Sequence, residues 1–201
     1  MLDISGYLAS VLSVSVPATN IAVPTIPATS VAYSFIQVNP MGYRPSKMPF
    51  GYDENDPRCI EFKARLRDTI ETLIGEGYAH FISGGALGMD MFAAEAVLEL
   101  KEKYPWIVLE MVSPFDAQAA PWDDEYRIRH DRLFATADIV TTTGHEYTWV
   151  CMFRRNRYMV ENADLLLAAY DGQPGGTAMT CEYAREMGVP VRLIMPTARA
   201  A

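Results

Sequence analysis

The stretch "HFISGGALGMDMFAAEA", residues 80–96, joins a short apolar segment to a helical pattern through a turn with three glycines. The apolar segment is typical of a buried strand, and the alanines that follow favour a helix. Glycines 84, 85 and 88 allow a sharp turn and a close approach to a ligand, because they carry no Cβ. The exposed N–H groups and the positive helix end would then favour a phosphate. The alternative is that the glycines only serve a tight turn.

The same alternation of strand and helix continues along the chain. We expect helices at 58–78 (with Gly75 and Gly77 as stop signals), 91–104, 123–137, 151–163 and 178–188. Strands are expected at 79–83, 107–113, 138–143, 164–170 and 189–195. The strands are continuous apolar runs, which indicates a parallel sheet covered on both sides. With right-handed crossovers, the sequence predicts an α/β fold: a Rossmann-like, doubly wound, mostly parallel sheet with helices on both faces.

The beginning of the chain differs from the rest. No charged residue occurs from Ile4 to Tyr43, and prolines at 17, 24 and 27 argue against a long helix or a central strand. We expect residues 1–33 to form an uncharged, proline-interrupted extension that leads into a first strand. Residues 34–197 are expected to form one Rossmann-like nucleotide-binding domain, since 201 residues, half of them apolar, suffice for one substantial core.

Composition restricts the partners. The net charge of −8 disfavours general nucleic-acid binding, whereas a small anionic ligand needs only a few arginines and backbone N–H groups. Three scattered cysteines and three histidines suggest neither a disulfide framework nor a metal site, and we expect no cofactor. No signal peptide or membrane span is evident, so a cytoplasmic protein without membrane contact is expected. A homo-oligomer remains an open alternative.

In a doubly wound sheet, ligands bind beyond the carboxyl ends of the strands. The corresponding loops are "MGYRPSK", "SGGALGMD", "SPFDAQ", "TGHEYTW" and "DGQPGGTAM", and two of them are glycine-rich directly before a helix. The candidate ligand-binding residues from these loops and the helix at 151–163 are Gly42, Tyr43, Arg44, Ser83, Gly84, Gly85, Gly88, Asp90, Arg154, Asn156, Asp171, Gly175, Gly176 and Thr177.

Several of these residues also have a purely structural interpretation. Asp90 could accept a hydrogen bond from a ribose hydroxyl, or it could complement the dipole of its helix. Arginines 154, 155 and 157 could clamp a phosphate or form a solvated basic face. The aromatic side chains of Tyr43, Tyr147 and Trp149 could stack on a base or anchor their loops.

The motifs "MGYRPSKMPFGYDENDPRC", "FISGGALGMDMFAAE", "RRNRYMV" and "DGQPGGTAMTCEYAR" together resemble the YpsA-like family. That family belongs to the SLOG superfamily, along with the DprA and LOG proteins, and the resemblance covers about residues 41–195. It implies a Rossmann-like domain that binds nucleotides or nucleotide-derived signals. One departure is in the first loop, where Tyr43 replaces the histidine of the family's Thr-Gly-His-Arg-Pro.

The LOG branch includes phosphoribohydrolases with a PGGxGTxxE motif. Pro174, Gly175, Gly176 and Glu182 match it, whereas Ala178 and Met179 do not. The resemblance places Arg155 at a catalytic arginine, with Arg154 in place of the acid that precedes it. Cleavage of an N-glycosidic bond needs a carboxylate near the developing oxocarbenium ion, and Glu182 could supply one or be an ordinary exposed helix residue.

Three functions follow, in order of preference. The first is binding or sensing of a nucleotide or nucleotide-derived small molecule at the carboxyl edge of the sheet. The second is a phosphoribohydrolase that uses Arg155 and Glu182 on a nucleoside monophosphate; whether the chain is an enzyme stays open. The third is a protein-interaction regulator with a vestigial pocket. DprA-like binding of single-stranded DNA ranks below these because of the acidic balance.

Overall fold

The computed structural model describes residues 36–195, so the expected extension at 1–33 lies outside the described residues. Within 36–195 the chain forms a six-stranded parallel sheet in the order β4-β3-β2-β1-β5-β6. The strands are β1 (Ile36–Gly42), β2 (Tyr78–Ser83), β3 (Val108–Ser113), β4 (Ile139–Thr142), β5 (Leu165–Ala169) and β6 (Val191–Leu193). The predicted doubly wound α/β fold is confirmed.

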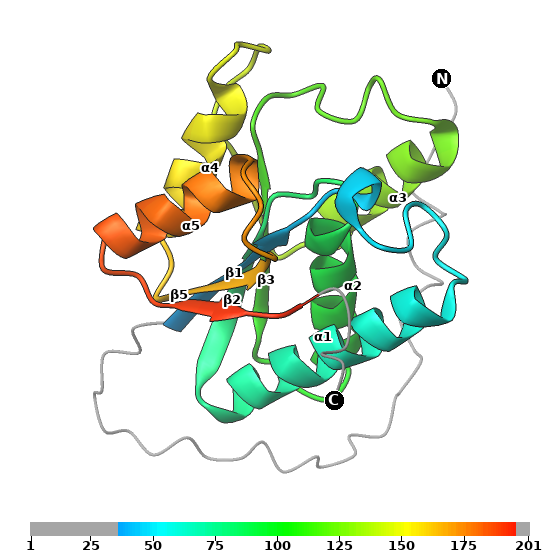
Figure 1. The fold of residues 1–201 in the computed structure, drawn as a ribbon, viewed down its shortest axis with the longest axis vertical. Coiled ribbons are helices and arrows are strands. Elements are labelled where there is room, and N and C mark those ends of the chain that lie inside the picture. Colours follow the sequence, from blue (N-terminus) through cyan, green and yellow to red (C-terminus); the bar gives the residue numbers. More distant parts are fainter. Residues whose placement is uncertain (1–35, 196–201) are drawn as a thin grey trace, which may run out of the picture. The chain divides into compact units, whose positions relative to one another are not determined.

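The helices divide between the two faces of the sheet, as Figure 1 shows. Three of them, α1 (Pro57–Gly75), α2 (Met89–Lys101) and α3 (Asp124–Thr136), pack on one face, and α4 (Cys151–Glu161) and α5 (Gly176–Glu186) pack on the other. A short 3-10 helix, η1 (Pro45–Lys47), follows β1. The neighbouring strands β1 and β5 are followed by helices on opposite faces of the sheet, so the loops after these two strands turn to opposite sides. This is the topological switch point at which such sheets bind ligands.

The predicted elements from residue 58 onward are all present, with ends that move by a few residues. The first strand differs more. The expected loop "MGYRPSK" begins at Met41, but β1 continues to Gly42 and pairs with β5 through Asn39, Pro40 and Met41. Its pairing with β2 stops at Val38, two residues before Pro40, which has no N–H to donate to a sheet ladder.

The larger core lies between the sheet and the face covered by α1 and α2. Phe62, Leu66, Ile70 and Leu73 of α1 are fully buried there, and they follow one another at helical spacing in the sequence. A smaller cluster under α4 and α5 includes Val160, Leu166 and Cys181. Within residues 36–195 no helix is both long and apolar enough to cross a membrane.

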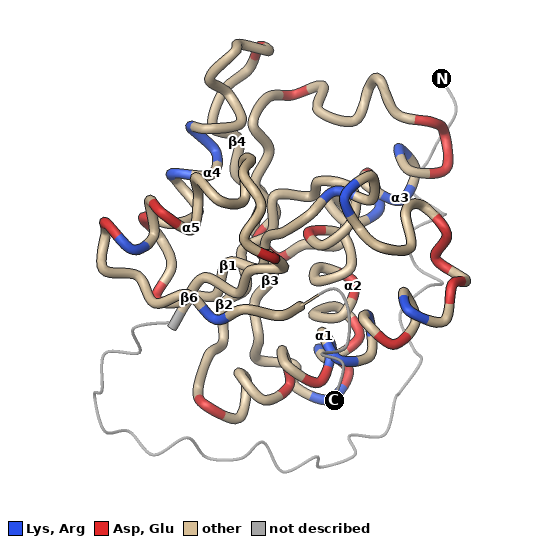
Figure 2. Tube along the Cα trace, viewed as in Figure 1, with Lys and Arg blue, Asp and Glu red and all other residues tan. Residues whose placement is uncertain are grey.

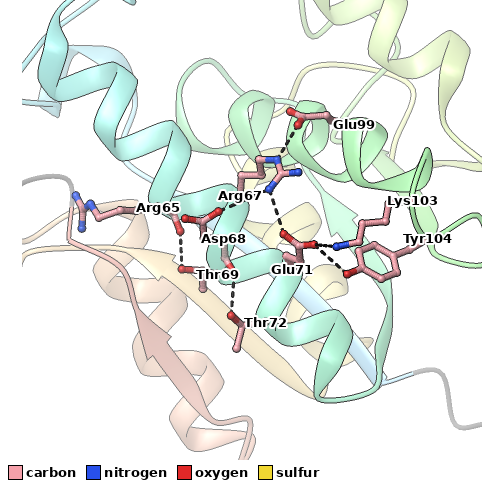
Figure 3. Close-up of polar contacts among 9 residues, drawn as sticks. All are labelled: Arg65, Arg67, Asp68, Thr69, Glu71, Thr72, Glu99, Lys103 and Tyr104. Carbon is pink, nitrogen blue, oxygen red and sulfur yellow. Dashed lines mark hydrogen bonds and ion pairs between the residues drawn. The ribbon is translucent and has the colours of Figure 1, made fainter.

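An ion-pair network links the outer surfaces of α1 and α2 (Figure 3). Arg67 of α1 contacts Glu99 of α2 at 2.6 Å and Glu71 of its own helix at 3.1 Å. Glu71 in turn accepts from Lys103 at 2.7 Å and from the Tyr104 hydroxyl at 2.9 Å. Partly exposed pairs of this kind contribute about 0–1 kcal/mol each, so apolar burial dominates the packing of α1.

Two isoleucines of α1 test this assignment of its faces. Ile70 is fully buried and Ile60 is 57% exposed. We expect Ile70→Ala to lower the free energy of unfolding by about 2–5 kcal/mol because it leaves a cavity. Ile60→Ala should change it by less than about 0.5 kcal/mol. Urea denaturation followed by circular dichroism measures both, and equal midpoints for the two variants would contradict the packing of α1.

Candidate functional site: a cation-lined cavity at the switch point

A cavity of about 310 Å³ lies at the switch point. Four segments line it: the end of β1 with the loop that follows, the start of α2, one side of α4, and the first turn of α5. The lining residues are Met41, Gly42, Tyr43, Arg44, Ser46, Lys47, Ala86, Asp90, Met152, Arg155, Asn156, Gly176 and Thr177. We call this the cation-lined cavity, because its charged residues are three basic side chains and one acidic side chain.

Arg155 links several of the segments around the cavity through hydrogen bonds. Its side chain is buried, and Nη1 donates a hydrogen bond of 2.6 Å to the carbonyl oxygen of Gly84. A Cβ at position 84 would overlap this guanidinium, so only glycine leaves room for it. Nε of Arg155 donates to Oδ1 of Asn156 at 2.9 Å, and Nδ2 of Asn156 donates to Thr180 of α5 at 3.1 Å. One arginine therefore connects α4, α5 and the loop after β2.

The other two glycines of the opening stretch also make room for protein atoms. Gly85 has a φ of +62°, and a Cβ there would lie 2.8 Å from the ring of Phe134. Gly88 caps α2 with a φ of +91°, and its Cβ would lie 2.6 Å from the carbonyl oxygen of Tyr43. Ser83 Oγ donates to the carbonyl of Asp90 at 2.8 Å. The loop thus packs tightly, and of this loop only Ala86 lines the cavity.

Asp90 is the carboxylate of the cavity. It is 5% exposed, and its Oδ2 lies 3.8 Å from Nη1 of Arg155. Burial raises the pKa of Asp90, although the Arg155 guanidinium and the N–H groups of Ala86 and Gly42 act in the opposite direction. Burial also lowers the pKa of Arg155, which Asp90 opposes and the nearby Arg44 reinforces. Burial thus disfavours the charged forms of both Asp90 and Arg155, and the positive charge of Arg44 also repels the Arg155 guanidinium.

The first turn of α5 forms the opposite wall. Its N-cap is Gly175, so no side chain caps the N–H groups of the first turn. Gly176 and Thr177 line the cavity. Nζ of Lys47 donates to the Pro174 carbonyl at 3.2 Å, and a Cβ at Gly175 would lie 2.8 Å from that nitrogen. The positive end of α5 and the Lys47 ammonium therefore lie at the same wall.

Most of the predicted residues lie at the cavity or directly behind its lining. The structure brings together Gly42, Tyr43, Arg44, Asp90, Arg155, Asn156, Gly176 and Thr177, and leaves Ser83, Gly84, Gly85, Gly88 and Gly175 in supporting positions behind the wall. The Tyr43 hydroxyl donates to the carboxylate of the exposed Asp171.

Two predicted residues lie elsewhere. Arg154 is exposed on another side of α4 and lines a separate, more open pocket of about 610 Å³ with Thr141 and Phe153. Glu182 is exposed on α5 and does not line the cavity. Sequence reasoning missed Lys47 and Met152. The position of Lys47 in the first loop, three residues after Arg44, was the available signal.

A family model described as the YspA SLOG family, YpsA, matches residues 38–195. The chain belongs to this YpsA family of SLOG proteins. It is 31% identical over 138 residues to a UPF0398 protein of Bacillus pumilus, covering 68% of this chain and 74% of that one. A UPF0398 protein of Halalkalibacterium halodurans is 32% identical over 162 residues, with 77% and 85% covered.

Solved structures of DNA processing protein A (DprA) share the fold of this YpsA-family chain. The protein from Helicobacter pylori, described with a single-stranded DNA binding mode, aligns with a TM-score of 0.57 at 17% identity. DprA from Streptococcus pneumoniae aligns with a TM-score of 0.57 at 19% identity. Both alignments cover 79% of this chain, which spans 65% and 50% of the two DprA chains respectively.

The expectation that excluded general nucleic-acid binding is contradicted by this comparison, because a structural neighbour binds single-stranded DNA. The comparisons also give no support to a small molecule as the partner. The error came from using net charge, which sums the whole chain, whereas binding depends on the local field. Figure 2 shows basic segments on α4 and on the loop that contains η1, while α1 and α3 carry residues of both signs.

Glycine can be required in this structure for its positive φ alone or also for a close contact. A comparison of Gly172 with Gly88 distinguishes these two requirements. Both have positive φ, +91° and +98°, but a Cβ at 172 would meet nothing within 4 Å. Alanine should cost about 1–2 kcal/mol at either position through backbone strain. Gly88→Ala should cost at least about 1 kcal/mol more, because it also forces the Tyr43 carbonyl away. Thermal or urea unfolding of both variants measures the difference, and equal stability would refute the close contact.

Proposed function

We propose that the cation-lined cavity binds the phosphate and sugar of a nucleotide, either free or within a single-stranded nucleic acid. The observation that carries the proposal is the charge of the cavity: Arg44, Lys47 and Arg155 line it together with one carboxylate, Asp90, and the start of α5. Arginine and backbone N–H groups at a helix N-terminus are the groups that proteins use to bind phosphate.

The electrostatics of Arg155 support an anionic ligand. Its guanidinium is buried, and the positive charge of Arg44 already opposes its protonated form. Asp90, at 3.8 Å, compensates only part of this charge. A phosphate in the cavity would add negative charge beside Arg155 and Arg44, so the binding free energy would include relief of their repulsion.

The polar groups beside the cations fit the sugar. Asp90 lines the cavity, and its carboxylate accepts hydrogen bonds in the ionised form, as a sugar hydroxyl requires. Asn156 already bonds Arg155 and Thr180, so its principal role is to orient the guanidinium. In this arrangement the phosphate contacts the basic side chains of Arg44, Lys47 and Arg155, and the sugar hydroxyls contact Asp90.

We propose binding without hydrolysis of the nucleotide. A phosphoribohydrolase that used Glu182 would need this carboxylate beside the ligand, but Glu182 is exposed outside the cavity. The regulator with a vestigial pocket predicts instead that no nucleotide binds in the cavity.

Arg44 and Arg154 form a matched pair that tests the proposal. Both are exposed arginines near the edge of the sheet, but only Arg44 lines the cavity. We expect Arg44→Ala to weaken binding of 5′-AMP by about tenfold or more, since it removes a charge-assisted contact, and Arg154→Ala to leave it within about twofold. Isothermal titration calorimetry measures both.

A short single-stranded oligonucleotide, titrated in parallel, distinguishes the two sources of the phosphate. Tighter binding of the oligonucleotide with a steep loss in salt indicates nucleic acid, and tighter binding of 5′-AMP indicates a free nucleotide. Failure of both ligands to bind at millimolar concentration, or equal losses in the two arginine variants, would reject the proposed site.

A further inference from the structure

A second cavity of about 370 Å³ adjoins the first. The two share Arg44, Ala86 and Met152 as lining residues, so these side chains form a common border. A ligand whose phosphate contacts Arg44 therefore lies next to the second cavity.

Four of the eleven residues that line this second cavity are aromatic. They are Tyr52, Phe115, Trp122 and Tyr147, and we call it the aromatic cavity. Tyr52 is 54% exposed and Tyr147 is 71% exposed, so neither ring serves the core. Tyr147 packs edge-to-face on Phe115, with ring centroids 5.5 Å apart and an interplanar angle of 79°. Rings held at a cavity wall in this way offer faces on which a nucleobase can stack.

Gln118 adds a directional polar group to the aromatic cavity. It lines the cavity and is only 4% exposed. Its Nε2 donates a hydrogen bond of 3.1 Å to the Gly84 carbonyl, which fixes the orientation of the amide because a carbonyl accepts only from the nitrogen side. Oε1 then has no hydrogen-bond partner among the residues that the structure describes. Oε1 has almost no accessible surface, so a ligand reaches it only after a small shift of the neighbouring side chains. A buried acceptor without a partner is costly, and an N–H donor on a ligand would then satisfy it.

We propose that the aromatic cavity binds the base of the same nucleotide, stacked on Tyr147 and donating an amino N–H to Oε1 of Gln118. This inference rests on the proposed function, because the phosphate must occupy the cation-lined cavity. It goes further by assigning a second site and by selecting bases that carry an amino group, such as adenine. Apolar and aromatic walls with one placed polar group are the usual composition of such a site.

Tyr147 and Trp149 provide the test. Both are exposed aromatic residues of the loop before α4, at 71% and 89%, but only Tyr147 lines the aromatic cavity. Calorimetric titrations of the full chain with 5′-AMP and with ribose 5-phosphate compare ligands that share phosphate and sugar. We expect Tyr147→Ala to weaken 5′-AMP about tenfold and to leave ribose 5-phosphate unchanged, because only the base is stacked. Trp149→Ala should change neither ligand.

A third ligand tests the role of Gln118 without altering the protein. Purine riboside 5′-monophosphate lacks the amino group of adenine, and we expect it to bind about tenfold more weakly than 5′-AMP, since Oε1 is left unpaired. Equal affinities for these two ligands would overturn the hydrogen bond to Gln118. Loss of 5′-AMP and ribose 5-phosphate alike in Tyr147→Ala, or loss of neither, would overturn the base site.

These outcomes are separate from failure of the proposed function. If the unaltered chain binds none of 5′-AMP, ribose 5-phosphate and the single-stranded oligonucleotide, the cation-lined cavity is not a phosphate site and both proposals fall. If both ligands bind and respond to Arg44→Ala but 5′-AMP gains nothing from its base, the phosphate site stands and the aromatic cavity is excluded as the base site.

Discussion

The hydrogen bond from Arg155 to the Gly84 carbonyl is the contact on which the site depends. It reaches from α4, on one face of the sheet, to the loop that leads to α2 on the other face, and it exists only because residue 84 has no side chain. A buried guanidinium is costly unless its N–H groups are bonded and its charge is compensated. Gly84, Asn156 and Asp90 meet part of that need, and the remaining positive charge faces the cation-lined cavity.

The strand order explains why these residues meet there. Because β1 and β5 are neighbours while their following loops turn to opposite faces, a crevice forms between Gly42 and the start of α5. Arg44 and Lys47 enter it from the first loop, and Arg155 from α4. The adjoining aromatic cavity shares Arg44, so charge and stacking surface lie next to each other. A nucleotide combines these same two chemistries.

The sequence was sufficient for the fold but not for the arrangement of the site. Continuous apolar runs such as 165–169 and the helical stripe of Phe62, Leu66 and Ile70 follow from local physics, which is why the layers could be predicted. The partners of the glycines could not be, since the contacts of Gly84 with Arg155 and of Gly88 with Tyr43 join residues far apart in sequence. For the same reason a purely local argument kept Arg154 in the site and missed Lys47. Net charge, a property of the whole chain, was a poor guide to the local charge of one edge.

A crystal structure of the chain grown with 5′-AMP would show whether the two cavities hold one nucleotide. We expect the phosphate beside Arg44 and Arg155 at the first turn of α5, and the adenine ring on Tyr147 with its amino group toward Gln118. Density for 5′-AMP at another place on the protein, or a phosphate bound by the loop at Ser83 and Gly85 with the cation-lined cavity unoccupied, would refute this arrangement.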